Sequence, residues 1–199
     1  KYKVPRIAFI NKMDRMGADI FKAREMIQSK LGATPILMQL PIGSGDKFKG
    51  IVDLVKMKAM YWKDDTLGSE YSYEDIPSDM LKEAEQWRNS LIEKLSECDD
   101  DMCAKFLDGT DIDEKHIWDV LRKITLSFSA VPVFCGSAFK NKGVQPLLDA
   151  VISLLPSPLD RGEITGHDPV KEDKMVSFQP KTDEAFSAIA FKIANDPYA

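Results

Sequence analysis

Two short apolar runs that each end in a polar loop constrain the fold of this chain more than any other feature. Residues 7–10 lead directly into Asn11-Lys12-Met13-Asp14, and residues 131–134 lead into Cys135-Gly136-Ser137-Ala138. Short apolar runs of this kind are typical of strands buried on both faces of a parallel sheet. We therefore expect an α/β fold with a doubly wound sheet, in which functional residues follow the carboxyl ends of the strands.

The residue types of the first loop fit a guanine base. The Asp14 carboxylate can accept hydrogen bonds from guanine N1–H and the exocyclic amine, Asn11 can contact the N7 side, and the Lys12 stem can lie over the purine face. Adenine would turn a ring acceptor toward Asp14, which only accepts. Hydrogen bonds to charged groups contribute about 1.5–3 kcal/mol each, so this site can reject adenine. GTPases select guanine with the same Asn-Lys-x-Asp spacing, here with Met13 at the variable position.

The same segment also fits an ordinary polar loop, in which Asp14 or Asp19 caps the following helix. The second loop favours the guanine hypothesis. The backbone N–H of Ala138 can meet guanine O6, while the Ser137 hydroxyl can steady the Asp14 carboxylate. Two strand-end loops of the right kind, in the right order, therefore predict guanine binding by Asn11, Lys12, Met13, Asp14, Ser137 and Ala138.

The phosphate-binding half of a nucleotide site is missing from the sequence. No Gly-x-x-x-x-Gly-Lys-Ser/Thr segment occurs, and residues 43–47 have glycines and a lysine at a different spacing. No Asp-x-x-Gly segment for magnesium precedes the first strand, which begins six residues after Lys1. We therefore expect no catalytic residue within this chain, and no GTP, GDP or Mg²⁺ tightly bound to it alone.

Composition narrows the class of protein further. The 199 residues are 44% hydrophobic and 30% charged, as in soluble globular proteins, and no apolar run approaches the roughly 18–20 residues that span a bilayer. The net charge of −5 argues against a nucleic-acid grip through phosphates. We expect a cytoplasmic monomer that makes no contact with membranes.

Metal binding is not indicated by the titratable residues. The three cysteines, at positions 98, 103 and 135, lack metal-ligand spacing and are expected to be reduced thiols. His116 and His167 have no neighbouring ligand, and the aspartates at 99–101 and 108–113 do not fit the calcium-loop spacing. We expect those aspartates to cap helices or to lie in a solvated loop.

Spacing along the chain predicts an insertion. Asp14 and Ser137 are 123 residues apart, whereas a strand–helix–strand unit needs only about 30, so roughly 90 residues are inserted between them. Residues 41–129 are the natural candidate for an inserted α/β subdomain, and residues 157–184, rich in Pro, Gly and charge, for an interdomain linker.

Apolar periodicity and turn residues predict the individual elements. The expected helices are one at 19–31 ended by Gly32, one from Ser78 or Asp79 to about 97, one near 117–128 capped by Asp111 with Glu114, and one at 144–155. The expected strands are at 36–40, 48–55, 59–62, 71–73 and 185–193.

The chain resembles the elongation factor G family of ribosomal translocases along essentially its whole length. The segments that carry the resemblance are residues 4–15, 39–43, 50–54, 135–144 and 154–158, together with residues 186–198, which resemble the start of that family's second domain.

The resemblance implies a partial P-loop GTPase fold. Residues 1–40 and 130–156 would form the C-terminal half of the GTP-binding domain, and residues 185–199 would begin a β-barrel domain. The intact protein would bind GTP or GDP with Mg²⁺ and hydrolyse GTP on the ribosome to move tRNA and mRNA. Its partners would include a ribosomal stalk protein, contacted through the inserted subdomain. Neither His116 nor His167 occupies the position of the family's catalytic histidine.

Two alternatives stay open. A ribosome-protection or release-factor type of translational GTPase shares the Asn-Lys-x-Asp segment. The chain alone, without the phosphate half of the site, could instead act only as a protein-binding module through its inserted subdomain.

Overall fold

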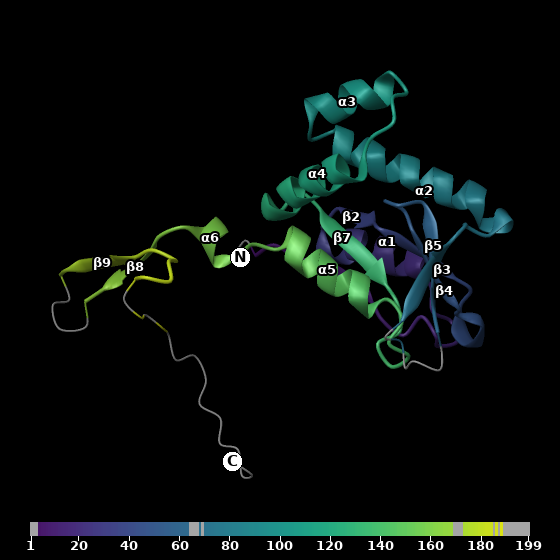
Figure 1. Ribbon diagram of the computed structural model, residues 1–199, viewed down its shortest axis with the longest axis horizontal. Coiled ribbons are helices and arrows are strands. Elements are labelled where there is room, and N and C mark those ends of the chain that lie inside the picture. The colour runs from purple at the N-terminus through teal and green to yellow at the C-terminus, as the bar shows by residue number, and fades with distance from the viewer. Residues whose placement is uncertain are drawn as a thin grey trace, which may run out of the picture. The chain divides into compact units, whose positions relative to one another are not determined.

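The computed structural model describes residues 4–63, 68, 70–168, 173–184, 186 and 188. The strand expected at 185–193, and with it the start of a barrel domain at 185–199, lies outside the described residues apart from two positions. The chain divides into two compact units, Lys1–Leu155 and Pro156–Ala199 (Figure 1). The expected insertion, residues 41–129, belongs to the same unit as the residues on both sides of it.

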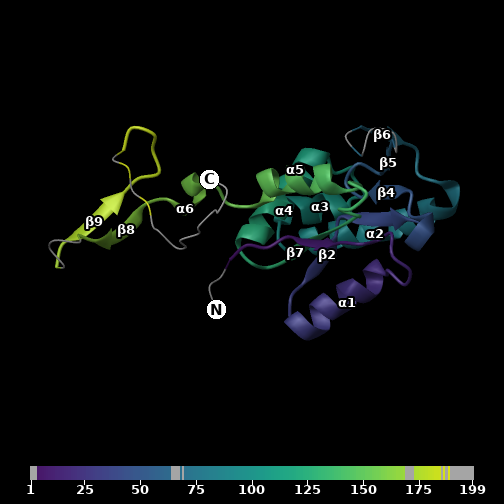
Figure 2. The same cartoon turned by 90° about the horizontal axis from the view of Figure 1, so that it is seen from below.

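A three-stranded parallel sheet forms the centre of the first unit, as the apolar runs predict. Strand β1 (Ala8–Ile10) pairs with β7 (Val131–Cys135), which pairs in turn with β2 (Pro35–Leu37). Helix α1 (Ile20–Leu31) covers one side of this sheet, and helices α4 (Glu114–Leu126) and α5 (Val144–Leu154) cover the other (Figure 2). The mixed α/β fold with helices on both sides of a parallel sheet is thereby confirmed.

Helix α1 has both of the ends that its sequence predicts. The Asp19 side chain caps its start by accepting hydrogen bonds from the N–H groups of Phe21 and Lys22, at 2.9 and 3.0 Å. Gly32 ends it in the left-handed region with φ 59°, a conformation that glycine adopts without steric cost.

The strand expected at 36–40 is in fact two strands that belong to different sheets. At Met38 the chain leaves β2 and enters β3 (Gln39–Ile42). The N–H of Met38 donates to Val133 O at 2.9 Å, and its carbonyl accepts from the N–H of Leu54 at 3.0 Å. Strand β3 then opens an antiparallel sheet, in the order β3, β4 (Gly50–Asp53), β5 (Lys58–Trp62), β6 (Tyr71–Glu74). Met38 is therefore the corner that joins the two sheets.

Three helices follow the antiparallel sheet, one more than the sequence predicts. Helix α2 (Ser78–Ser96) matches the expected apolar stripe. Helix α3 (Asp100–Leu107) was not expected, because eight residues are too few to show a clear helical period. The next helix, α4, begins at an unexpected cap: Asp113, rather than Asp111, accepts the hydrogen bond from the N–H of His116, at 2.8 Å.

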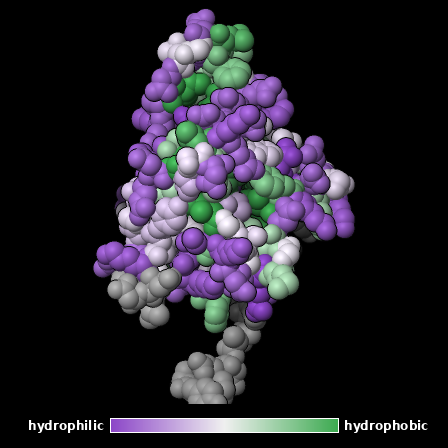
Figure 3. Space-filling view, turned by 90° about the vertical axis from the view of Figure 1, so that its right-hand side faces the viewer, coloured by the Kyte–Doolittle hydropathy of each residue, from purple (hydrophilic) through white to green (hydrophobic). Residues whose placement is uncertain are grey.

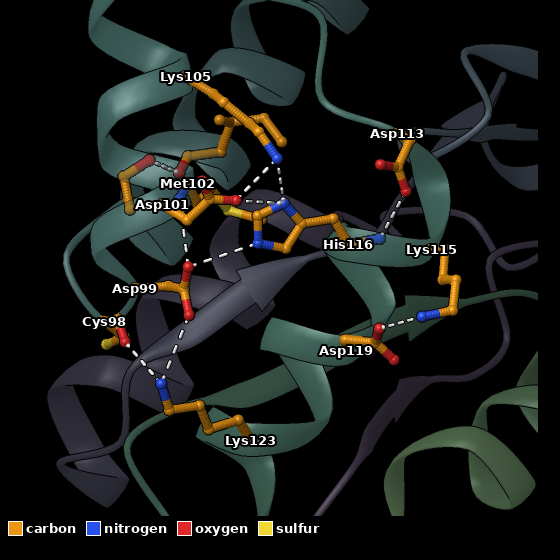
Figure 4. Close-up of polar contacts among 12 residues, drawn as sticks. Cys98, Asp99, Asp101, Met102, Lys105, Asp113, Lys115, His116, Asp119 and Lys123 are labelled. Atoms are coloured by element: carbon orange, nitrogen blue, oxygen red, sulfur yellow. Dashed lines mark hydrogen bonds and ion pairs between the residues drawn. The ribbon is translucent and has the colours of Figure 1, made fainter.

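Polar contacts fasten α3 to α4 (Figure 4). Asp99 caps α3 by accepting from the N–H of Met102 at 3.1 Å, and its carboxylate lies 3.4 Å from both His116 Nε2 and Lys123 Nζ. Lys105 Nζ lies 2.7 Å from an Asp101 oxygen and 3.4 Å from His116 Nδ1. The N–H of Met102, assisted by His116 and Lys123, holds the pKa of Asp99 below its usual value. The expectation of helix caps among these aspartates is thus confirmed at Asp99 and Asp113.

The second unit contains regular structure in the segment expected to be a linker. A helical turn, α6 (Pro158–Arg161), starts at Ser157, whose side chain and N–H both contact the Asp160 carboxylate. An antiparallel pair follows, β8 (Ile164–His167) with β9 (Met175–Phe178). The pairing of β8 with β9 was not predicted, because the Pro, Gly and charged residues of this segment are typical of a linker.

Hydrophilic side chains cover most of the molecular face shown in Figure 3, with smaller hydrophobic areas between them. None of the helices in the described part of the chain is both long and apolar enough to cross a lipid bilayer.

Replacing Asp99 with alanine should lower the free energy of unfolding by about 1 kcal/mol, because the change removes a helix cap. The contacts to His116 and Lys123 should add little to this loss. Urea denaturation followed by circular dichroism measures the effect. The matched control is Glu85→Ala on the exposed side of α2, which should change stability by less than about 0.5 kcal/mol. An Asp99→Ala protein as stable as this control would contradict the capping role.

Candidate functional site

Pairing of β1 with β7 brings the two predicted loops together at the carboxyl ends of these strands. The N–H of Gly136 donates to Ile10 O at 3.1 Å, and the N–H of Met13 donates to Gly136 O at 3.0 Å. The parallel ladder thus continues from the strands into the loops. Of the six residues predicted to bind guanine, all lie in these two adjacent loops.

Asn11 links the loops through its side chain. Its Oδ1 accepts hydrogen bonds from the N–H of Lys12 at 2.7 Å and from the N–H of Ala138 at 3.0 Å. The sequence predicts that the Ala138 N–H meets guanine O6, so in the structure Asn11 Oδ1 would have to share this donor with a base. Lys12 itself is exposed. Its backbone φ of 64° is unusual for a residue other than glycine and turns the chain away from the direction of the strand.

Asp14 combines an enclosed side-chain oxygen with a lowered pKa. Its Oδ1 is enclosed by protein and accepts no hydrogen bond from a described residue. Enclosed polar atoms in proteins are normally paired, so an orphan acceptor calls for a specific explanation. The Ser137 hydroxyl, with smaller contributions from Lys140 and Arg15, holds the pKa of Asp14 below its usual value of 3.8. The carboxylate is therefore ionised at neutral pH and can accept hydrogen bonds from a bound donor.

Ser137 sits in a closed and fully buried turn. Its N–H donates to Lys142 O at 2.9 Å, and the N–H of Lys142 donates back to Ser137 O at 3.0 Å. The N–H of Lys140 lies 3.3 Å from Ser137 Oγ. Gly136, next to it, cannot be replaced freely, because a Cβ there would overlap the Lys142 carbonyl oxygen. The turn thus fixes the Ser137 hydroxyl in the position from which it acts on Asp14.

Met13 differs from the other five predicted residues, because its side chain is fully buried in the core. It contributes only through its backbone, whose carbonyl accepts from the N–H of Gly45 at 3.0 Å. In the sequence alone, residues 43–47 have glycines and a lysine without the spacing of a phosphate loop. In the structure they contact the first loop through this hydrogen bond, and Gly45 adopts φ 58°. The paired glycines at 43 and 45 were the signal that a turn of unusual backbone geometry lay there.

A metal centre is not formed by the described residues. Within residues 4–63, 68, 70–168 and 173–184, no group of three or more His, Cys, Asp and Glu could hold an ion. His116 instead makes the contacts between α3 and α4 described above.

Comparison with known proteins assigns the family. The chain matches the family described as "Elongation factor Tu GTP binding domain" over residues 1–157. The chain belongs to this family of translation-factor GTPase domains. This agrees with the guanine chemistry of the two loops.

One solved structure is similar in fold. It is a crystal structure of a protein from Thermus thermophilus, with a TM-score of 0.67 and 23% sequence identity over 87% of this chain. At this identity the likeness establishes a shared fold. The present chain spans 26% of that protein's length.

Replacing Ser137 with alanine should raise the pKa of Asp14 toward 3.8, because the hydroxyl that favours the ionised form is removed. A lowered pKa in the folded state stabilises the fold above pH 3.8, and this contribution is lost as the pH falls below that value. The Ser137→Ala protein should therefore lose less stability on acidification. Titration of the Asp14 side-chain carboxyl carbon by NMR measures the shift.

The control for this experiment is Ser90→Ala on α2, which should leave the Asp14 titration unchanged. An Asp14 curve that is identical in the Ser137→Ala protein and the unmodified chain would rule out the contact.

Proposed function

We propose that this chain is part of an elongation factor G, a GTPase that works on the ribosome to move tRNA and mRNA during protein synthesis. The observation that supports the proposal is the ionised Asp14 carboxylate, which Ser137 of the second loop stabilises while the Asn11–Ala138 hydrogen bond joins the two loops. Guanine offers two adjacent donors, N1–H and the exocyclic amine, that would satisfy this carboxylate. Adenine lacks that pair of donors.

Each loop residue has a separate part in this proposal. Asp14 selects the base, Ser137 keeps it ionised, and Asn11 holds the second loop while its amide faces the N7 side of guanine. Ala138 supplies a backbone donor to O6, and the Lys12 stem covers the purine ring. Met13 acts through its backbone, since its side chain belongs to the core.

Hydrolysis belongs to other parts of the longer protein. Mg²⁺ bound to the phosphates would neutralise charge that develops during phosphoryl transfer, and the phosphate-loop segment that accompanies it is missing from this sequence. The chain alone is proposed to bind GTP or GDP weakly and to be catalytically inactive, because phosphate contacts are missing from its sequence.

The proposed division of the chain follows from the same reasoning. Residues 1–40 and 130–156 form the guanine-binding half of the GTPase domain, residues 41–129 the inserted subdomain, residues 157–184 a connection, and residues 185–199 the start of a further domain. The longer protein is proposed to act in the cytoplasm, with the ribosome as its partner. The exposed polar side of α2, opposite its apolar stripe, is the proposed contact for a ribosomal stalk protein.

A release-factor or ribosome-protection GTPase is the nearest alternative. Residues 137–143 and 39–43 favour the translocase, because these segments resemble that family most closely. For the isolated chain, a role as a protein-binding module is the second candidate. The size of the proposed insertion, residues 41–129, and its mixture of strands and helices support this candidate.

In the longer protein, Asp14→Asn should weaken GTP binding and favour xanthosine triphosphate. Xanthine has an oxygen at C2, which accepts a hydrogen bond from the new amide where guanine would present a donor. A loss of one or two charge-assisted hydrogen bonds predicts at least about a tenfold weaker Kd for GTP. Calorimetric titration with both nucleotides measures the exchange of preference.

Asp19→Asn is the matched control, because asparagine also caps helices and Asp19 lies outside both loops. It should leave both affinities unchanged. An Asp14→Asn protein that still prefers GTP as strongly as the unmodified protein would remove Asp14 from its proposed role.

A further inference from the structure

A cavity of about 300 Å³ lies in the first unit between the two sheets and helices α4 and α5. None of the residues proposed to bind guanine lines it. Its size is at the lower end of the roughly 300–1,000 Å³ typical of small-molecule sites. The lining combines three carboxylates, from Asp53, Glu114 and Asp149, with three aromatic rings, from Tyr73, Trp118 and Phe134.

Gln39 and Asp53 are the buried polar side chains among the described lining residues, and Asp53 is the charged one. It is 9% exposed at the end of β4, and its Oδ1 accepts hydrogen bonds from the N–H groups of Val55 at 2.8 Å and Lys56 at 3.0 Å. Its other oxygen, Oδ2, accepts no hydrogen bond from a described residue. Burial raises the pKa of Asp53 above its usual value. Because this side chain is largely withdrawn from solvent, a cation or donor at Oδ2 would stabilise its ionised form.

The neighbouring cations do not supply that partner. Lys56 is the one basic residue among the described lining residues, and its Nζ lies over the ring of Tyr73, 4.6 Å from the centroid. The Arg88 guanidinium lies close enough to attract Asp53, but it donates its hydrogen bonds to the carbonyl oxygens of Leu54, Val55 and Ile112. No ion pair joins Asp53 to a described lysine or arginine.

The arrangement of the carboxylates favours an extended ligand over a metal ion. They do not converge, since no group of three such residues in the described part of the chain could hold an ion. Asp53 and Phe134 are buried, whereas Glu114 and Asp149 are exposed. The cavity therefore has a carboxylate at its buried end, aromatic rings along its side and two carboxylates at its exposed end. A ligand with a positive charge at each end and an apolar section between them complements this arrangement.

We propose that this cavity binds an aliphatic diamine. One ammonium group donates to Asp53 Oδ2, the methylene chain packs against Tyr73, Trp118 and Phe134, and the second ammonium lies near Glu114 and Asp149. An ammonium group suits a single free carboxylate oxygen, because it is a compact charge that does not need two parallel acceptors. The proposal does not depend on guanine binding, since the two sites share no residue.

The test uses the full 199-residue chain and 1,5-diaminopentane as the probe. NMR should show saturable shifts of the Trp118 indole N–H, with smaller changes at the indoles of Trp62 and Trp87. Asp53→Asn keeps the oxygen that accepts from Val55 and Lys56 but removes the charge, so it should weaken binding at least about tenfold. Lys56→Gln removes the competing cation and should tighten binding several-fold.

Glu85→Gln, an exposed change on α2 outside the cavity, is the control for loss of general negative charge and should not alter binding. Pentylamine should bind more weakly than the diamine, and 1,5-pentanediol should not bind. Absence of saturable shifts at Trp118, equal binding by the Asp53→Asn protein, or an equal loss in the Glu85→Gln protein would each overturn the proposal. Thermal unfolding of each variant verifies that it is folded.

Discussion

Parallel pairing between β1 and β7 is the interaction on which the rest of the structure depends. It joins segments that are far apart in the sequence, with Ala8 opposite Val133 and Ile10 opposite Cys135. The ladder then extends into the loops through the Gly136–Ile10 and Met13–Gly136 hydrogen bonds. Because the register of the strands sets the register of the loops, Asp14 and Ser137 can meet only if this pairing forms. The large insertion is tolerated because it leaves and rejoins the core without disturbing that pair.

The two loops contain backbone conformations that lower the stability of the fold locally, and packing elsewhere offsets this loss. Lys12 and Asn141 occupy left-handed backbone conformations, which cost of order 1–3 kcal/mol each for residues other than glycine. Asp14 adds an enclosed oxygen that accepts no hydrogen bond from a described residue. Such features persist where the surrounding structure holds them, here through the buried Met13 side chain and the closed turn at Ser137.

The sequence predicted the elements whose signals are local. Apolar runs indicated β1, which is half-buried at the edge of the sheet, and β7, which is buried, and Asp19 and Gly32 predicted both ends of α1. Features that depend on contacts between distant segments could not be predicted from the sequence. The change of sheet at Met38 was not predictable, because residues 35–42 form one nearly continuous apolar run, and α3 is too short to show a period. Asp111 and Asp113 are equally good caps by residue type, and only tertiary packing decides between them.

The guanine loops were predictable in composition but not in geometry. The residue types of the two loops predicted a guanine ligand, and the order of the loops predicted that they lie close together. The Asn11–Ala138 hydrogen bond, the burial of Met13 and the support from Gly45 depend on backbone positions that no residue pattern encodes. The cavity around Asp53 was equally hidden, since its lining comes from strands and helices that are widely separated along the chain.

Titration of the ¹⁵N-labelled chain with guanosine and adenosine monophosphates tests the central claim most directly. Even weak binding at millimolar concentration is visible by NMR. The amide signals of Asn11 to Asp14 and of Ala138 should shift with the guanine nucleotide and stay in place with the adenine nucleotide. Equal shifts with both nucleotides, or shifts confined to residues outside these two loops, would contradict it.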